Sequence, residues 1–181
     1  MILSYSYGCV MAMLPEKLAA KVRQFGLLLD NSEIYEIDDD EQGREDEPHI
    51  TIKYGLKTNN VDELREVIGG FGVIRATLGV VSRFENENDV LKIEVESADL
   101  VELNKLISDN FECKDSFPDY TPHVTIAYVN KGAGKDLDGR TDFAGIDVDF
   151  YGVVYSMPDG SRDMIDLVSE TKVAREILWR I

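Results

Sequence analysis

The chain has 181 residues, of which 44% are hydrophobic and 30% are charged, which suits a globular domain with a core large enough to need no disulfides. Its formal net charge of −16 argues against a broad grip on long nucleic acid, which needs patches of Lys and Arg, but leaves room for a small anionic substrate. Cys9 and Cys113 form no CxxC or zinc-like spacing, and no apolar run approaches roughly 18 residues or has the form of a signal peptide. We therefore expect a cytoplasmic protein with reduced thiols and no membrane span.

The first part of the chain predicts a strand, a helix and an acidic loop. Residues 5–14 alternate with the period of a strand, and one face is formed by Tyr5, Tyr7, Cys9, Met11 and Met13. A helix is expected over 15–29, because Pro suits a first turn and an apolar stripe is formed by Leu18, Val22, Phe25 and Leu29. Residues 36–47 hold eight carboxylates and one arginine, which predicts a solvated loop.

Beyond residue 60 the pattern predicts a mixture of short helices and strands. Helices are expected over 61–68, 100–107 and 171–181, and strands over 73–84, 90–96, 146–156 and 163–169. The Gly-, Asp- and Lys-rich region 130–144 predicts a loop. The order of elements predicts a mixed α/β (α+β) domain.

One heptapeptide occurs twice. Pro-His-Ile-Thr-Ile-Lys-Tyr at 48–54 returns as Pro-His-Val-Thr-Ile-Ala-Tyr at 122–128, and the two copies contain His49 and His123, the only histidines of the chain. An unperturbed histidine has a pKa of about 6.5 and therefore gains or loses a proton near neutrality. The repeat predicts one general base facing one general acid.

Each copy is expected to be a strand with a polar face. Alternate residues of a strand share a face, so His49 and Thr51 lie roughly 6.5 Å apart on one side while Ile50 faces the core. The second copy predicts the same for His123 and Thr125. Two such strands side by side would place two imidazoles and two hydroxyls around one site.

Lys53 is the only charged residue of either copy besides the histidines. Simple alternation puts Lys53 on the face of His49, where its charge would lie near a bound phosphate, and its counterpart is Ala127. Tyr54 and Tyr128 fall on the opposite face, and we expect them to pack in the core or between lobes.

This arrangement suits a phosphodiester. A neutral histidine can take the proton of a 2′-hydroxyl or a water, and a protonated histidine can give one to the leaving oxygen. The threonines can donate to the non-bridging oxygens as negative charge builds on them. We expect neither a metal nor another cofactor, and the pattern leaves open which histidine is the base.

Paired His-x-Thr motifs, one per lobe, are the signature of the 2H phosphoesterase superfamily, which the chain resembles over most of 5–169. The resemblance implies a bilobal, pseudo-twofold fold in which two antiparallel sheets meet at a central cleft with helices outside. It implies a single domain over 1–181, with one lobe formed by 5–70 plus the C-terminal strands and the other by 73–130. It also implies metal-independent phosphodiesterase chemistry with a catalytic set formed by His49, Thr51, His123 and Thr125. The tail 170–181 has no place in the resemblance.

Among branches of the superfamily, the chain looks most similar to phage anti-CBASS nucleases. This similarity rests on two sequence segments, His-Ile-Thr-Ile-Lys-Tyr-Gly-Leu and Tyr-Ser-Tyr-Gly-Cys-Val-Met. The branch implies cleavage of cyclic di- or trinucleotide signals in viral immune evasion, in the host cytoplasm. One alternative is a 2′,3′-cyclic phosphodiesterase or an RNA 2′,5′-ligase-like enzyme of RNA ends. Another is a non-catalytic sponge that binds a nucleotide and releases it intact.

Three further features have competing interpretations. Tyr7 is a candidate substrate-binding residue, since its ring could stack on a base or its hydroxyl contact a phosphate, and core packing is an equally good interpretation. Trp179 is interpreted as packing, with a lid over a base or an oligomer contact as alternatives. In the acidic loop, the spacing of Asp38, Asp40 and Gly43 imitates a calcium-binding loop, but His49 stands where such a loop needs a glutamate.

Overall fold

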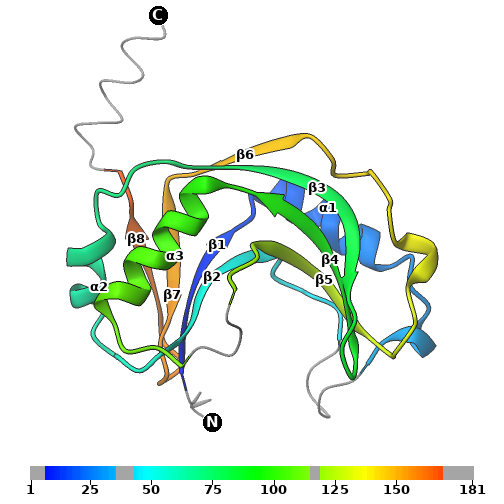
Figure 1. Cartoon of the computed structure of the whole chain (residues 1–181), viewed down its shortest axis with the longest axis horizontal. Coiled ribbons are helices and arrows are strands. Elements are labelled where there is room, and N and C mark those ends of the chain that lie inside the picture. Colours follow the sequence, from blue (N-terminus) through cyan, green and yellow to red (C-terminus); the bar gives the residue numbers. More distant parts are fainter. Residues whose placement is uncertain (1–6, 36–42, 115–118, 169–181) are drawn as a thin grey trace, which may run out of the picture.

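The computed structural model describes residues 7–35, 43–114 and 119–168. These residues form one eight-stranded antiparallel sheet in the order β6-β3-β4-β5-β2-β1-β7-β8. The strands are β1 (Gly8–Met13), β2 (His49–Leu56), β3 (Ile74–Phe84), β4 (Asp89–Glu96), β5 (His123–Val129), β6 (Ile146–Phe150), β7 (Gly152–Ser156) and β8 (Arg162–Asp166). Figure 1 shows that the sheet is strongly curled.

In the described part of the chain three helices accompany the sheet, namely α1 (Glu16–Gly26), α2 (Val61–Ile68) and α3 (Ala98–Asn110), with single 3-10 turns at Asn31–Glu33 and Lys135–Leu137. Side chains cap two of them. The Asn60 side chain accepts from the Asp62 amide at the start of α2, and the Ser97 hydroxyl accepts from the Leu100 amide at the start of α3. Such caps satisfy amides that the first helical turn leaves without partners.

The helices pack on the face of the sheet that forms the core. Helix α1 contacts β5, where Gly26 lies against Ile126, and α3 contacts β2 and β3. Apolar residues of all three helices join the strand residues in one buried cluster. The alternate residues of β2 and β5, which include the histidines, therefore belong to the other face.

The predicted α+β class is confirmed, and the two predicted sheets are halves of one sheet. One half is β6-β3-β4-β5 and the other is β2-β1-β7-β8. Between β2 and β5 a single residue pair, Ile50 with Val124, is in register, and both side chains are fully buried. The halves thus meet at the two repeated heptapeptides.

Most predicted elements are present with small changes of bounds. Helix α2 has the predicted bounds, and the strands predicted over 73–84 and 90–96 form the hairpin β3–β4. Helix α1 ends at Gly26, three residues before the predicted end at Leu29. The Arg44 side chain donates to the backbone carbonyls of Gly26 and Leu29, on either side of this end. Leu29 is nevertheless buried, as its place in the apolar stripe predicts.

The prediction of one strand over 146–156 is wrong. The segment breaks at the exposed Tyr151 into β6, which forms one edge of the sheet against β3, and β7, which pairs with β1 near the other edge. The chain passes directly from one half to the other because the sheet is curled. Strand alternation identifies exposed and buried positions but not pairing partners, so the sequence pattern could not show this break.

The acidic loop begins and ends on β5. Ile34 forms an isolated bridge with Val129, and Arg44 forms one with Ala127, so the chain on both sides of the loop lies along β5. Residues 36–42 of the loop, Tyr5, and the tail with Trp179 lie outside the described residues, so the expectations for them stay predictions.

Candidate active site

The two His-x-Thr motifs lie side by side at the centre of the sheet. His49 and Thr51 flank Ile50 on β2, and His123 and Thr125 flank its partner Val124 on β5. All four side chains are half-buried, on the face opposite the buried pair. Because the strands are antiparallel, the histidines lie at diagonal corners of this set, each facing the threonine of the other motif. The predicted meeting of the two motifs is thus observed.

Both imidazole rings are held in the same way. Nδ1 of His49 lies 2.7 Å from the Glu47 carbonyl oxygen, and Nδ1 of His123 lies 2.8 Å from the Thr121 carbonyl oxygen. A carbonyl only accepts, so each Nδ1 carries a hydrogen, and in a neutral ring Nε2 keeps its lone pair. In both motifs a proline separates the carbonyl from the histidine, and the residue before a proline is confined to extended backbone. The proline therefore helps to fix the position of the carbonyl that orients the imidazole ring.

The placement predicted for Lys53 is wrong. The β1–β2 register runs from Met11 opposite Thr51 to Val10 opposite Lys53, which leaves Ile52 as an extra residue. Such a bulge puts two successive side chains on the same side. Lys53 accordingly faces the core side with Val10 and is only 7% exposed.

A bulge of the same kind occurs in the second motif, and the two bulges change where the tyrosines that follow them lie. Lys92 pairs with Thr125 and Leu91 with Ala127, so Ile126 is the extra residue there. Beyond the bulges, Tyr54 is 46% exposed and Tyr128 is 38% exposed, so the core, which was one of the two placements predicted for them, is wrong. The bulge reverses the alternation and turns both tyrosines away from the core.

Tyr7 lies next to one of these tyrosines. Its ring meets the Tyr54 ring edge-on at 6.0 Å, and the Lys114 ammonium lies 5.2 Å from its centroid. Tyr7 is half-buried and thus keeps an accessible part. These contacts are with Tyr54 and Lys114, and a role for Tyr7 in substrate binding stays a prediction.

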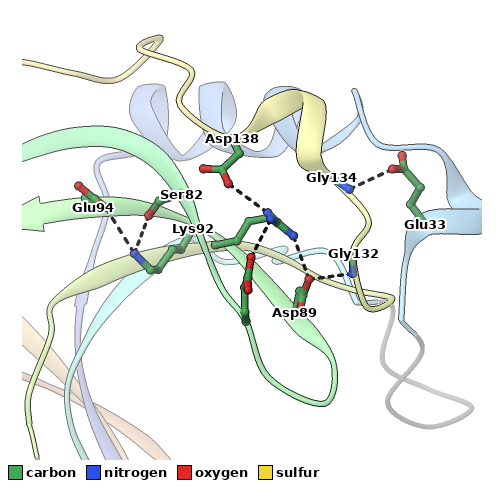
Figure 2. A network of polar contacts seen from close by, with 10 residues as sticks. Glu33, Ser82, Asp89, Lys92, Glu94, Gly132, Gly134 and Asp138 are labelled. Atoms are coloured by element: carbon green, nitrogen blue, oxygen red, sulfur yellow. Dashed lines mark hydrogen bonds and ion pairs between the residues drawn. The ribbon is translucent and has the colours of Figure 1, made fainter.

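Two residues that the sequence analysis missed lie beside His123. Phe84 of β3 stands edge-on to the His123 ring with centroids 5.0 Å apart, and the Lys92 ammonium lies 4.4 Å from the centroid of Phe84. Lys92 is 5% exposed and donates to the Ser82 hydroxyl at 2.7 Å, with Glu94 at 4.0 Å (Figure 2). Lys92 alternates with the buried Leu91 and Ile93 and so occupies an outward position of β4, where the local pattern gives no sign that a neighbouring strand buries it.

These surroundings act on the charge of His123. Burial lowers the pKa of His123 below its usual value, and the nearby charges of Lys92 and His49 lower it further, against the hydrogen bond to Thr121. Burial also lowers the pKa of Lys92 itself. The lowered pKa favours a neutral His123 at neutral pH.

The Thr51 side has a different environment. Cys9 hydrogen-bonds the Thr51 side chain, and burial raises the pKa of the Cys9 thiol to about 11, which keeps it protonated and unreactive. The Tyr120 hydroxyl donates to the Thr51 carbonyl at 3.0 Å and ties the segment before β5 to β2.

Two imidazoles at diagonal corners, each with a hydroxyl beside it, form the arrangement that the paired His-x-Thr motifs predict. The sequence family described as the 2′-5′ RNA ligase superfamily matches residues 14–137, more than half of the chain and both motifs. The chain belongs to this superfamily, and it is an enzyme of the phosphodiesterase type. Among the described residues, no helix is long and apolar enough to cross a membrane, and no cluster of His, Cys, Asp and Glu could hold a metal ion.

Solved structures share the fold at low sequence identity. The protein TT0787 of Thermus thermophilus is 16% identical, with a TM-score of 0.64 over 91% of this chain and 99% of that one. A crystal structure described as a phosphoesterase is 12% identical, with a TM-score of 0.58 over 90% and 95%. Kluyveromyces marxianus Usb1, solved with uridine monophosphate, is 11% identical, with a TM-score of 0.51 over 90% and 98%. No curated protein matches the chain.

Proposed function

We propose that this protein cleaves a phosphodiester bond of a small nucleotide without a metal, with His123 as general base and His49 as general acid. The observation that carries the proposal is the diagonal arrangement of the two histidines with both Nδ1 atoms engaged. That leaves Nε2 of each ring as the atom that can exchange a proton with a substrate.

The reaction proceeds by one displacement at phosphorus. A ribose 2′-hydroxyl or a water attacks, and its proton passes to Nε2 of His123 as the new P–O bond forms. The bond to the leaving oxygen breaks, and that oxygen takes the proton from Nε2 of His49. Thr51 and Thr125 donate to the non-bridging oxygens, which gain negative charge in the transition state.

The lowered pKa of His123 supports this assignment of roles. A base must be unprotonated at the start of the reaction, and burial favours the uncharged ring. His49 lies on the other diagonal corner, and we therefore assign it as the proton donor to the leaving oxygen.

Two substrate classes fit the proposal. Cyclic di- or trinucleotides, as in viral anti-CBASS activity, are compact, and the net charge of −16 disfavours long polyanions. Nucleotide ends of RNA are the second class, supported by the similarity in fold to Usb1, whose structure contains uridine monophosphate. In either case we propose that Tyr7 contacts the substrate beyond the histidines.

A product assay in EDTA tests the function. Purified protein is incubated with cyclic dinucleotides, cyclic trinucleotides, 2′,3′-cyclic mononucleotides and short RNAs, and the products are identified by mass. The proposal predicts turnover of at least one substrate with a bell-shaped pH dependence. Stoichiometric binding and release of intact ligand would instead identify a sponge, and activity abolished by EDTA and restored by a divalent cation would contradict metal-independent chemistry.

A further inference from the structure

The local twofold of the site is broken in the strands that flank the two motifs. On β4, Lys92 lies opposite Thr125 and Glu94 lies opposite His123. The equivalent positions of β1 are Met11, opposite Thr51, and Met13, opposite His49. The His123 side is therefore filled by charged groups and Phe84, whereas the His49 side is apolar.

A groove opens on the apolar side. It has a volume of about 350 Å³, near the lower end of ligand-binding pockets, and it is lined by Met13, Glu47, Val154, Arg162, Asp163 and Met164. Met13 is the strand partner of His49, and Val154 pairs with both Met11 and Met164. The groove therefore runs from Met13, the strand partner of His49, across β7 to β8.

Arg162 connects the groove to the histidine. Its guanidinium lies 2.7 Å from the Glu47 carboxylate, and the Glu47 carbonyl is the group that holds Nδ1 of His49. Both side chains are about half exposed, so the guanidinium plane is available at the wall of the groove. The other carboxylate of the lining, Asp163, lies 3.2 Å from Arg65.

The side chains that line the groove favour binding of a flat aromatic ring over binding of a second phosphate group. Thioethers make favourable contacts with aromatic rings, and guanidinium planes stack on bases. The lining carries two carboxylates, Glu47 and Asp163, against one guanidinium, Arg162, so its net charge is negative and disfavours a second phosphate. An uncharged base meets no such repulsion and covers Met13 and Met164.

We propose that this groove binds the nucleobase of the nucleoside that carries the leaving oxygen. The inference rests on the proposed function, because it uses His49 as the proton donor to that oxygen. The groove begins at the strand partner of His49, so a nucleoside that receives its proton there has its base next to Met13. The site is thus specific for a nucleoside leaving group and poor for an alkyl one.

Methionine methyl NMR tests this directly. The protein, labelled with ¹³C at its methionine methyls, is titrated with the four nucleoside 5′-monophosphates and with ribose 5-phosphate as the control without a base. Saturable ring-current shifts of Met13 and Met164 with at least one nucleotide, and none with ribose 5-phosphate, are expected. Equal responses to ribose 5-phosphate, or unmoved signals with every nucleotide, would overturn the inference.

A charge variant provides the second measurement. Met164 is 64% exposed, so Met164→Glu should fold, and it is expected to weaken nucleotide binding at least tenfold. Leu27→Glu makes the same kind of change at a residue 70% exposed on another part of the surface and should leave binding unchanged. Equal effects of the two variants would contradict a base site in the groove.

The proposal for the groove and the proposal for the reaction can be refuted independently of each other. Shifts at Met13 and Met164 without turnover of any substrate would support the groove and refute the catalytic proposal. Turnover with unmoved methionine signals would refute the groove alone.

Discussion

Lys92 occupies, beside Thr125, the position that Met11 occupies beside Thr51 in the other half of the site. Both residues point to the face of the histidines, and both are nearly buried. One half thus places a cation beside its histidine and the other places a thioether. This difference, rather than any residue of the heptapeptides, distinguishes the two halves chemically.

The Lys92→Met variant should therefore change the pH dependence of the reaction. Removing the charge raises the pKa of His123, because Lys92 contributes to lowering it. A base with a higher pKa stays protonated up to a higher pH, so the acidic limb of the kcat/KM profile moves to higher pH. Activity should fall more at about pH 5.5 than at about pH 8.

The Lys53→Met variant is the matched control for this experiment. It removes a lysine that is almost equally buried but faces the core side. It should leave the acidic limb of the profile in place, whatever its effect on stability. An unmoved limb in Lys92→Met, or an equal shift in Lys53→Met, contradicts the influence of Lys92 on His123.

Replacing either histidine should abolish most of the activity. His49→Ala and His123→Ala are each expected to lower kcat by roughly 10²- to 10⁴-fold, the usual contribution of a positioned acid or base. The double variant should be little worse than the worse single variant, because the two groups act in one step. Single-turnover rates with circular dichroism as the folding control measure this, and fully additive losses would argue against concerted action.

The meeting of the two motifs could be predicted from sequence because it depends on repetition and simple alternation. His49 and Thr51 precede the bulge, so alternation placed them correctly. Lys53 and Tyr54 follow it, and alternation placed both on the wrong face. Gly55, with a positive φ of 97°, is a local sign of irregularity just after the first copy, but the second copy is followed by Val129 and lacks this sign.

Residues that reach the site from other strands could not be predicted in this way. Phe84 and Lys92 lie within a hairpin whose pattern shows which residues face inward, but not which strand β4 joins next. The pairing of β4 with β5 brings Lys92 to the site, and it is a long-range contact that no local period encodes. The groove at Arg162 requires the pairing of β7 with β1 for the same reason.

The two threonines should contribute as hydrogen-bond donors to the transition state. Thr51→Val and Thr125→Val keep the shape of the side chain and remove the hydroxyl, and each is expected to lower kcat by roughly 10²-fold with little change in KM. Thr141→Val, at an exposed position, is the control and should leave both constants unchanged. A rise in KM with unchanged kcat would assign the hydroxyls to ground-state binding instead.

The turn end of the β3–β4 hairpin should depend on a buried ion pair. Arg83 lies 2.9 Å from Asp89, and the two side chains are 7% and 2% exposed. The same Asp89 oxygen accepts from the Gly132 amide at 2.8 Å, and Arg83 also contacts Glu85 and Asp138; Figure 2 shows this network. The other Asp89 oxygen is buried without a partner among the described residues, so this carboxylate depends heavily on Arg83.

Arg83→Ala should consequently cost more stability than Asp89→Ala. Loss of the guanidinium leaves a buried carboxylate with one amide donor, for which about 3–5 kcal/mol is typical. Loss of the carboxylate leaves Arg83 with Glu85 and Asp138, and the cost should be smaller. Urea unfolding of both variants measures the difference, and a reversed order would show that Asp89 is stabilised by groups other than Arg83. Because this hairpin carries Phe84 and Lys92, we expect Arg83→Ala also to lower activity at temperatures where the protein stays folded.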